Sequence, residues 1–102
     1  MTVRLVFDWD PVKETAHLRK HGVRFSEAMS VFSDPFSLSK FDEEHSGAEE
    51  RWITLGLGAL GEPVLVVHTY VELPSGSVDI RVVSAGRPTR REIQPFWKGR
   101  QQ

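Results

Sequence analysis

The sequence predicts a small α+β domain in which two early helices precede a mostly antiparallel sheet and a short C-terminal helix. Patterns typical of helices are confined to residues 10–35 and to the C-terminal end, and short strand-like segments fill most of the remainder. The 102 residues are enough for one hydrophobic core, so we expect a single domain over residues 1–102. We expect the helices to cover one sheet face and leave the other as a working surface.

The chain is expected to open with a strand. Val3, Leu5, Phe7 and Trp9 recur at every second position, which is the spacing of one strand face. The strand pattern stops at the polar residues that follow Trp9, where helical signals begin.

Two helices joined by a glycine corner are predicted between residues 10 and 35. Asp10 can cap a helix whose first residue is Pro11, because proline needs no N–H at that position. Gly22 supplies the left-handed residue that commonly ends a helix. Ser26 can cap the second helix, and Asp34, which precedes a proline, ends it. The second helix has an apolar stripe for packing on a sheet, formed by Phe25, Ala28, Met29 and Phe32.

The rest of the sheet is predicted downstream of these helices. Strands are expected over residues 36–41, 51–57, 64–71 and 78–85. A polar loop over residues 42–50 and a turn at residues 73–77 separate them, and such short links indicate an antiparallel meander. Pro88 starts a last helix, which we expect Pro95 to limit.

Composition and charge restrict the classes of function. With 39% hydrophobic and 26% charged residues, the chain is ordinary for a soluble globular protein. It has no apolar run of membrane-spanning length and no signal-peptide pattern, and its lack of cysteine suits a cytoplasmic protein. The net charge of −1 excludes a protein that is basic throughout. However, acidic residues cluster over 42–50 and basic ones near the C-terminus, so a nucleic-acid partner is compatible with the sequence.

One side of the first helix carries basic and titratable residues. Lys13, His17, Lys20 and His21 stand at i, i+4, i+7 and i+8, so they project from one side. This pattern is typical of a solvated face as well as of a functional surface. The two histidines have metal-ligand spacing, but Leu18 stands where a zinc-hydrolase helix carries Glu, and there is no cysteine. We therefore expect no metal and no cofactor.

Further candidates for chemistry occur in the second half of the chain. They are His45, Arg51, His68 and Arg81. Each also has a structural interpretation: His68, among valines, is expected to be a hydrogen-bonded sheet residue, and Arg51 could pair with Glu49 or Glu50. Gathered together, such groups could cleave RNA without a metal, because one removes the 2′-OH proton, another protonates the leaving oxygen, and cations stabilise the phosphate.

Five motifs occur in order along the chain. They are F-x-W-D-P-x-K at 7–13, K-H-G-V-x-F-x-E-A at 20–28, V-F-x-D-P at 31–35, D-x-x-H-S-x-x-E-E-R at 42–51 and R-V-V-S-A at 81–85. Together they make the chain similar to the BrnT toxin family over about residues 5–96. The resemblance implies a RelE-like α+β fold and a ribonuclease toxin of a type II toxin–antitoxin pair, which cleaves RNA and arrests growth.

The resemblance also implies partners and site residues. The partners would be an RNA substrate and a BrnA-type antitoxin with a ribbon-helix-helix part, through which the toxin would reach operator DNA indirectly. By position, the catalytic candidates are Lys20, His21, His45, Glu50, Arg51 and Arg81. Arg51 and Arg81 suit phosphate binding, and His45 or His21 suits proton transfer. By charge, the RNA-binding candidates are Lys13, His17, Arg87, Arg90 and Arg91.

The sequence also departs from the family pattern. Gly86 stands where the family usually has Arg, Phe96 where a Tyr is common, and His17 where the family has Asn. An Arg is also missing near Val71, and Arg87 or His17 could compensate for the lost cation. These departures lead to an alternative function, a catalytically degenerate toxin homologue that acts with its antitoxin as a protein-binding module and co-repressor. A third alternative is a small domain that binds neither RNA nor an antitoxin.

Overall fold

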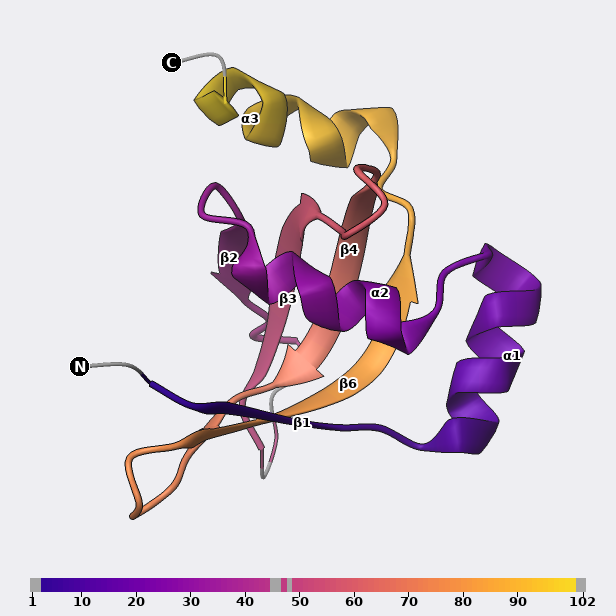
Figure 1. Cartoon of the computed structure of the whole chain (residues 1–102). Helices are drawn as coiled ribbons and strands as arrows, with labels where there is room; N and C mark the ends of the chain where they lie inside the picture. Colours follow the sequence, from indigo (N-terminus) through magenta and orange to yellow (C-terminus); the bar gives the residue numbers. More distant parts are fainter. Residues whose placement is uncertain (1–2, 45–46, 48, 101–102) are drawn as a thin grey trace.

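The computed structural model describes residues 3–44, 47 and 49–100. A strand, two helices, a run of strands and a final helix follow one another, as predicted (Figure 1). The elements are β1 (Leu5–Asp8), α1 (Pro11–His21), α2 (Phe25–Ser30), η1 (Val31–Ser33), β2 (Leu38–Phe41), β3 (Arg51–Leu57), β4 (Pro63–Thr69), β5 (Val71–Glu72), β6 (Val78–Gly86) and α3 (Arg90–Arg100). This order confirms the predicted α+β class with its C-terminal helix.

The strands pair in the order β1-β6-β4-β3-β2, and β5 pairs with β6 outside this path. β1 is parallel to β6, whereas the other pairs are antiparallel. The strand predicted over residues 64–71 is interrupted at Tyr70, which separates β4 from β5. The turn predicted after it is present: Leu73 donates its N–H to the Ser77 carbonyl at 2.8 Å, and Gly76 has a φ of 87°. The long β6 therefore joins the β1 and β5 end of the sheet to β4.

Helix α1 has the boundaries that its end residues predict. Asp10 Oδ1 accepts a hydrogen bond from the Val12 N–H at 2.9 Å, and Pro11 is the first helical residue. Gly22, with a φ of 70°, donates its N–H to the Leu18 carbonyl at 2.9 Å. No residue of this helix is buried. Its tertiary contacts are mainly with β6, at whose side it stands (Figure 1).

Helix α2 begins two residues earlier than predicted. Its N-cap is Arg24 and its first residue is Phe25, so the prediction that Ser26 caps it is wrong. The Phe25 N–H, unpaired within the helix, donates to Oε2 of Glu14 at 3.1 Å. A carboxylate of α1 therefore supplies the acceptor that a cap side chain would give, and it also suits the positive end of the helix dipole. The helix passes into the 3₁₀ turn η1 and ends before Asp34, as predicted.

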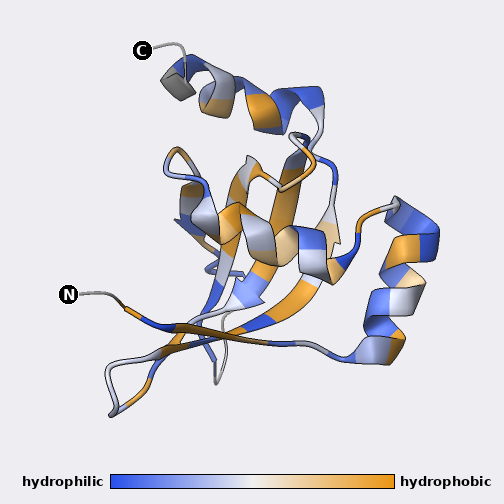
Figure 2. Cartoon of the chain, in the orientation of Figure 1, coloured by the Kyte–Doolittle hydropathy of each residue, from blue (hydrophilic) through white to orange (hydrophobic). Residues whose placement is uncertain are grey.

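The hydrophobic core lies between α2 with η1 and the middle of the sheet. The buried cluster comprises Val23, Phe25, Ala28, Val31, Val64, Val66, Val82 and Ala85. Of the predicted apolar stripe, Phe25 and Ala28 are fully buried, whereas Met29 and Phe32 are half-buried. Figure 2 shows hydrophobic colour concentrated on the strands behind α2. Burial of this cluster supplies most of the driving force that holds α2 on the sheet.

Helix α3 crosses one end of the sheet (Figure 1) and contacts β3. It continues through Pro95 to Arg100, so the prediction that Pro95 limits it is wrong. Phe96, directly after the proline, is 1% exposed, and its burial offsets the hydrogen bond that proline cannot make. Helices α1 and α3 each have 11 residues, and none of the described helices has the length and apolar character needed to cross a bilayer.

Candidate functional site

A cleft of about 320 Å³ opens between helix α1, the segment before β3, and strands β3, β4 and β6. Three of its lining side chains are cationic: Lys13 of α1, Arg51 of β3 and Arg81 of β6. Glu49 is the one carboxylate among the described lining residues, so the lining is positive overall. The lining residues are Lys13, Gly47, Glu49, Arg51, Thr69, Arg81 and Val83. We call this site the cationic cleft.

The cationic cleft lies on the sheet face that α2 does not cover. Arg51 and Thr69 are register partners in the β3–β4 pair, so their side chains project to one face. Their neighbours Trp52 and His68 are also partners, and they project to the other face. Val66, two residues before His68 on β4, belongs to the core under α2. The working surface expected on the free sheet face is therefore occupied by cationic side chains.

The Arg81 backbone is fixed by Thr69. The Arg81 N–H donates to Oγ1 of Thr69 at 3.1 Å, and Thr69 is 5% exposed. Just beyond this contact the β4–β6 register shifts, because Val67 pairs with Ser84 but His68 pairs with Val82. The extra residue in β6 forms a bulge, a feature that redirects side chains beside functional sites. Sequence analysis missed Thr69 because a threonine within a β-branched strand gives no functional signal.

Behind Thr69, His68 is held in a buried hydrogen-bond chain. Its Nδ1 lies 2.9 Å from the Thr69 carbonyl, which can only accept, so Nδ1 carries the proton. In the neutral ring Nε2 then accepts from Oγ1 of Thr54 at 2.7 Å, and Oγ1 of Thr54 in turn accepts from Oγ of Ser39 at 2.8 Å. Burial lowers the pKa of His68, and the hydrogen bond to the Thr69 carbonyl partly opposes this shift. The prediction that His68 is a hydrogen-bonded sheet residue is confirmed.

Glu50 lies away from the cationic cleft. The Trp52 indole Nε1–H donates to Oε2 of Glu50 at 3.4 Å, and both residues line a separate hollow together with Glu72. Glu49 lines the cleft in its place. Strand alternation counted back from Arg51 would have selected Glu49, since residues two apart share a face.

The histidines of α1 do not line the cleft. The rings of His17 and His21 stack with centroids 5.5 Å apart, and His17 also packs on Phe25 at 5.5 Å. Burial, followed by the charges of His21, Lys20 and Lys13, lowers the pKa of His17. Lys20 is exposed near the end of the helix. The candidate His45 lies outside the described residues, and within them no three His, Asp or Glu side chains form a group that could hold a metal.

A comparison with protein-family models identifies the family of this chain. The family model described as the ribonuclease toxin BrnT of type II toxin–antitoxin systems matches residues 9–92, more than half of the chain. The chain belongs to the BrnT family. A comparison with curated proteins gives no match. The three cleft cations Lys13, Arg51 and Arg81 all fall within the segment that matches the BrnT family model.

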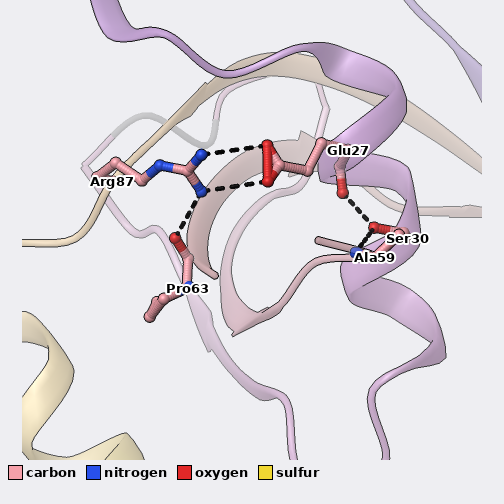
Figure 3. A network of polar contacts seen from close by, with 5 residues as sticks. All are labelled: Glu27, Ser30, Ala59, Pro63 and Arg87. Atoms are coloured by element: carbon pink, nitrogen blue, oxygen red, sulfur yellow. Dashed lines mark hydrogen bonds and ion pairs between the residues drawn. The ribbon is translucent and has the colours of Figure 1, made fainter. Parts of the chain in front are cut away.

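Of the basic residues near the C-terminus of this BrnT-family chain, Arg87 is engaged elsewhere. Its guanidinium forms a two-pronged ion pair with the Glu27 carboxylate, with N–O distances of 3.3 and 3.4 Å, and donates to the Pro63 carbonyl at 3.1 Å (Figure 3). The Glu27 side chain is 8% exposed, so the pair satisfies a buried charge. Arg87 thus ties the end of β6 to α2 and to β4. Arg90 and Arg91 are exposed in the first turn of α3.

Gly86 and Phe96, two of the positions at which the resemblance marks a departure from the family pattern, have different structural settings. Gly86 lies against α1: a Cβ built there would be 3.8 Å from Cγ of His21, an ordinary contact. A larger side chain at this position would therefore start beside the basic side of α1. Phe96 lies beyond the matched segment and is buried, so its ring anchors α3.

Proposed function

We propose that this chain is an endoribonuclease toxin that cleaves RNA in the cationic cleft without a metal ion. One observation carries the proposal: in a chain of the BrnT ribonuclease-toxin family, Lys13, Arg51 and Arg81 come from three separate elements and line one cleft. A cleft whose described lining carries three cations and one carboxylate has a positive potential that attracts a polyanion. The RNA backbone is such a polyanion.

The proposed reaction uses the RNA as its own nucleophile. The 2′-oxygen attacks the adjacent phosphorus while the bond from phosphorus to the 5′-oxygen of the next nucleotide breaks. A general base takes the 2′-OH proton and a general acid gives a proton to the departing 5′-oxygen, leaving a 2′,3′-cyclic phosphate and a 5′-OH. Arg51 and Arg81 would bind the non-bridging phosphate oxygens, where charge increases in the transition state. Lys13 would supply further positive charge from α1.

Glu49 is our proposed proton acceptor among the described residues. It lines the cleft with both arginines, whereas Glu50 is on the other side of β3. His45 keeps its predicted role in proton transfer as a proposal from the sequence. His21 and Lys20, at the end of α1, are proposed to contact RNA beyond the cleaved bond. Arg90 and Arg91, in the first turn of α3, remain RNA-binding candidates.

The proposed partner that silences this activity is a BrnA-type antitoxin with a ribbon-helix-helix part. Operator DNA would be bound by that part, so the toxin would contact DNA only through the complex. The toxin would act in the cytoplasm, where cellular RNA is available. A type II pair requires a protein antitoxin, and the family assignment is what supports this proposal.

The test uses protein purified free of antitoxin and incubated with RNA in the presence of EDTA. We expect discrete fragments that end in 2′,3′-cyclic phosphate, and no cleavage of DNA with the same sequence, because DNA lacks the 2′-OH. Intact RNA in the presence of folded protein would rule out the nuclease. Cleavage that EDTA abolishes would rule out the metal-independent mechanism.

The second candidate function is a degenerate toxin that serves as a co-repressor with its antitoxin. It is favoured by Gly86, which stands where the resemblance implies an Arg, and by Arg87, whose guanidinium is already paired with Glu27. A gel shift of operator DNA by the toxin–antitoxin complex, together with no RNA cleavage by free protein, would support this function over the first.

A further inference from the structure

A second concave surface lies on the sheet face opposite the cationic cleft. Two adjoining hollows of about 330 and 480 Å³ share Trp52 and Tyr70 as lining residues. The first is also lined by Phe32, Ser39 and His68, and the second by Glu50, Val71 and Glu72. We call the two hollows together the aromatic groove.

Strand alternation separates the aromatic groove from the cationic cleft. On β3, Trp52 of the groove directly follows Arg51 of the cleft. On β4, His68 of the groove directly precedes Thr69 of the cleft. Consecutive strand residues point to opposite faces. A molecule in the groove and one in the cleft therefore lie on opposite sides of the same strands.

The walls of the groove leave aromatic and aliphatic surface in water. Tyr70 is 37% exposed and Val71 is 39% exposed. Next to them Phe41, 37% exposed, packs its ring edge-to-face on Trp52 with centroids 5.3 Å apart. Clustered exposed aromatics are typical of protein–protein contacts, where Trp and Tyr contribute most of the binding free energy.

The charges at the groove select the kind of partner. Its ionisable lining residues Glu50 and Glu72 are carboxylates, and none of the described lining residues is Lys or Arg. The Trp52 indole N–H holds Glu50 at the groove wall. Two carboxylates beside the aromatics repel a phosphate backbone and attract cationic side chains. RNA therefore suits the cleft, and a basic polypeptide suits the groove.

We propose that the aromatic groove docks the antitoxin, by receiving one apolar side chain of an amphipathic antitoxin segment whose flanking Lys or Arg residues pair with Glu50 and Glu72. This docking proposal rests on one part of the proposed function, namely that the toxin has an antitoxin. The groove supplies affinity from the face that RNA does not use. Loss of docking and loss of cleavage are consequently separable.

The test measures toxin–antitoxin affinity for groove variants. The antitoxin probe is the purified small protein encoded next to the toxin gene. We expect Tyr70→Ala and Glu72→Lys each to weaken the complex by at least about tenfold, because one removes an aromatic anchor and the other reverses a complementary charge. Glu62→Lys, a matched reversal of an exposed carboxylate in the β3–β4 turn, is the control and is expected to bind like wild type.

The second readout is the NMR signal of the Trp52 indole N–H, assigned by its disappearance in Trp52→Phe. Antitoxin is expected to shift it, and a 12-nucleotide RNA is not. Wild-type affinity in both groove variants would overturn the proposal. A shift of the Trp52 signal on addition of RNA would also overturn it, and so would a failure of the antitoxin to bind wild-type toxin. RNA cleavage is measured on the same variants and is expected to match wild type. If wild type itself cleaves no RNA, the proposed nuclease fails while the affinities still decide the docking proposal.

Discussion

The backbone N–H of Arg81 donates to Oγ1 of Thr69 at 3.1 Å and joins β6 to β4 at the cationic cleft. On the other side of the same residue, the Thr69 carbonyl accepts from His68 Nδ1. Thr69 thus connects a buried neutral histidine to the strand that carries a cleft arginine. The cleft geometry depends on the packed side of the sheet as well as on its own side chains.

Removing either cleft arginine is expected to reduce RNA cleavage. Arg51→Ala and Arg81→Ala should each lower the cleavage rate by about 10²–10³-fold, because a positioned donor to the phosphate is lost. Both residues are at least partly exposed, so the melting temperature should change little. Gel quantification of RNA at equal protein concentration measures the effect. Arg19→Ala, which removes an exposed cation of α1 outside the cleft, is the control, and full activity in either cleft variant would show that its phosphate role is wrong.

The adjacent carboxylates Glu49 and Glu50 should behave differently. Glu49→Gln removes a proton acceptor from the cleft and should lower the rate by about 10²-fold or more. Glu50→Gln changes a residue of the aromatic groove and should leave the rate within a few-fold of wild type. Single-turnover cleavage rates compare the two. A larger loss of rate for Glu50→Gln than for Glu49→Gln would contradict the proposal that Glu49 is the base.

The Thr69 hydroxyl can be removed with little change of shape. Thr69→Val leaves the Arg81 N–H without its acceptor and should reduce the free energy of unfolding by about 1–3 kcal/mol. Thr69→Ser keeps the hydroxyl and should retain the Arg81 contact and the cleavage rate. Urea denaturation and cleavage assays on both variants test this. Equal cleavage by the Val and Ser variants would mean that the contact does not position Arg81.

The stability of the fold should fall as the pH decreases below about 6.5, the ordinary pKa of imidazole. Burial lowers the pKa of His68 and of His17, so below pH 6.5 the unfolded chain binds more protons than the folded chain does. The loss begins near pH 6.5 and continues down to the lowered folded pKa values. Urea midpoints between pH 7.5 and 5 measure it. His68→Gln is expected to be less stable at pH 7.5 but to show a flatter dependence, and an unchanged slope in that variant would contradict the assignment to His68.

The ion pair of Arg87 with Glu27 should matter for stability rather than for RNA. Arg87→Ala leaves a carboxylate that is 8% exposed without its partner, at a cost of about 1–3 kcal/mol. The same change in a Glu27→Gln background should cost clearly less, which a double-mutant cycle by urea denaturation would show. RNA cleavage by the folded Arg87→Ala protein should be close to wild type. A large loss of cleavage without loss of stability would instead support the predicted RNA-binding role.

Local signals predicted those elements whose ends are determined by neighbouring residues. Asp10, Pro11 and Gly22 fix α1 through contacts within a few residues of each other. The predicted start of α2 was wrong because the acceptor for its Phe25 N–H is Glu14, which lies eleven residues earlier in another helix. The C-terminal helix passes Pro95 because Phe96 is buried against the rest of the fold, which no local pattern reveals.

The sequence predicted only part of the cleft, because the cleft also depends on contacts between distant segments. Arg51 and Arg81 were found through family motifs, but their convergence depends on β6 lying beside β4, a pairing between distant segments. Strand alternation, which was available in the sequence, indicates that Glu49 rather than Glu50 shares the face of Arg51, and Glu49 does line the cleft. The engagement of Arg87 by Glu27 joins residues 60 positions apart, and sequence reasoning had no means of detecting it.

The most direct test of the central claim is an NMR titration with an RNA whose 2′-OH groups are replaced by hydrogen, so that it binds but cannot be cleaved. Side-chain signals of Arg51 and Arg81 and the backbone signal of Thr69 are expected to shift together, while the Trp52 indole signal stays in place. Shifts confined to Arg90 and Arg91 of α3, or centred on Trp52, would contradict the cationic cleft as the site where RNA binds.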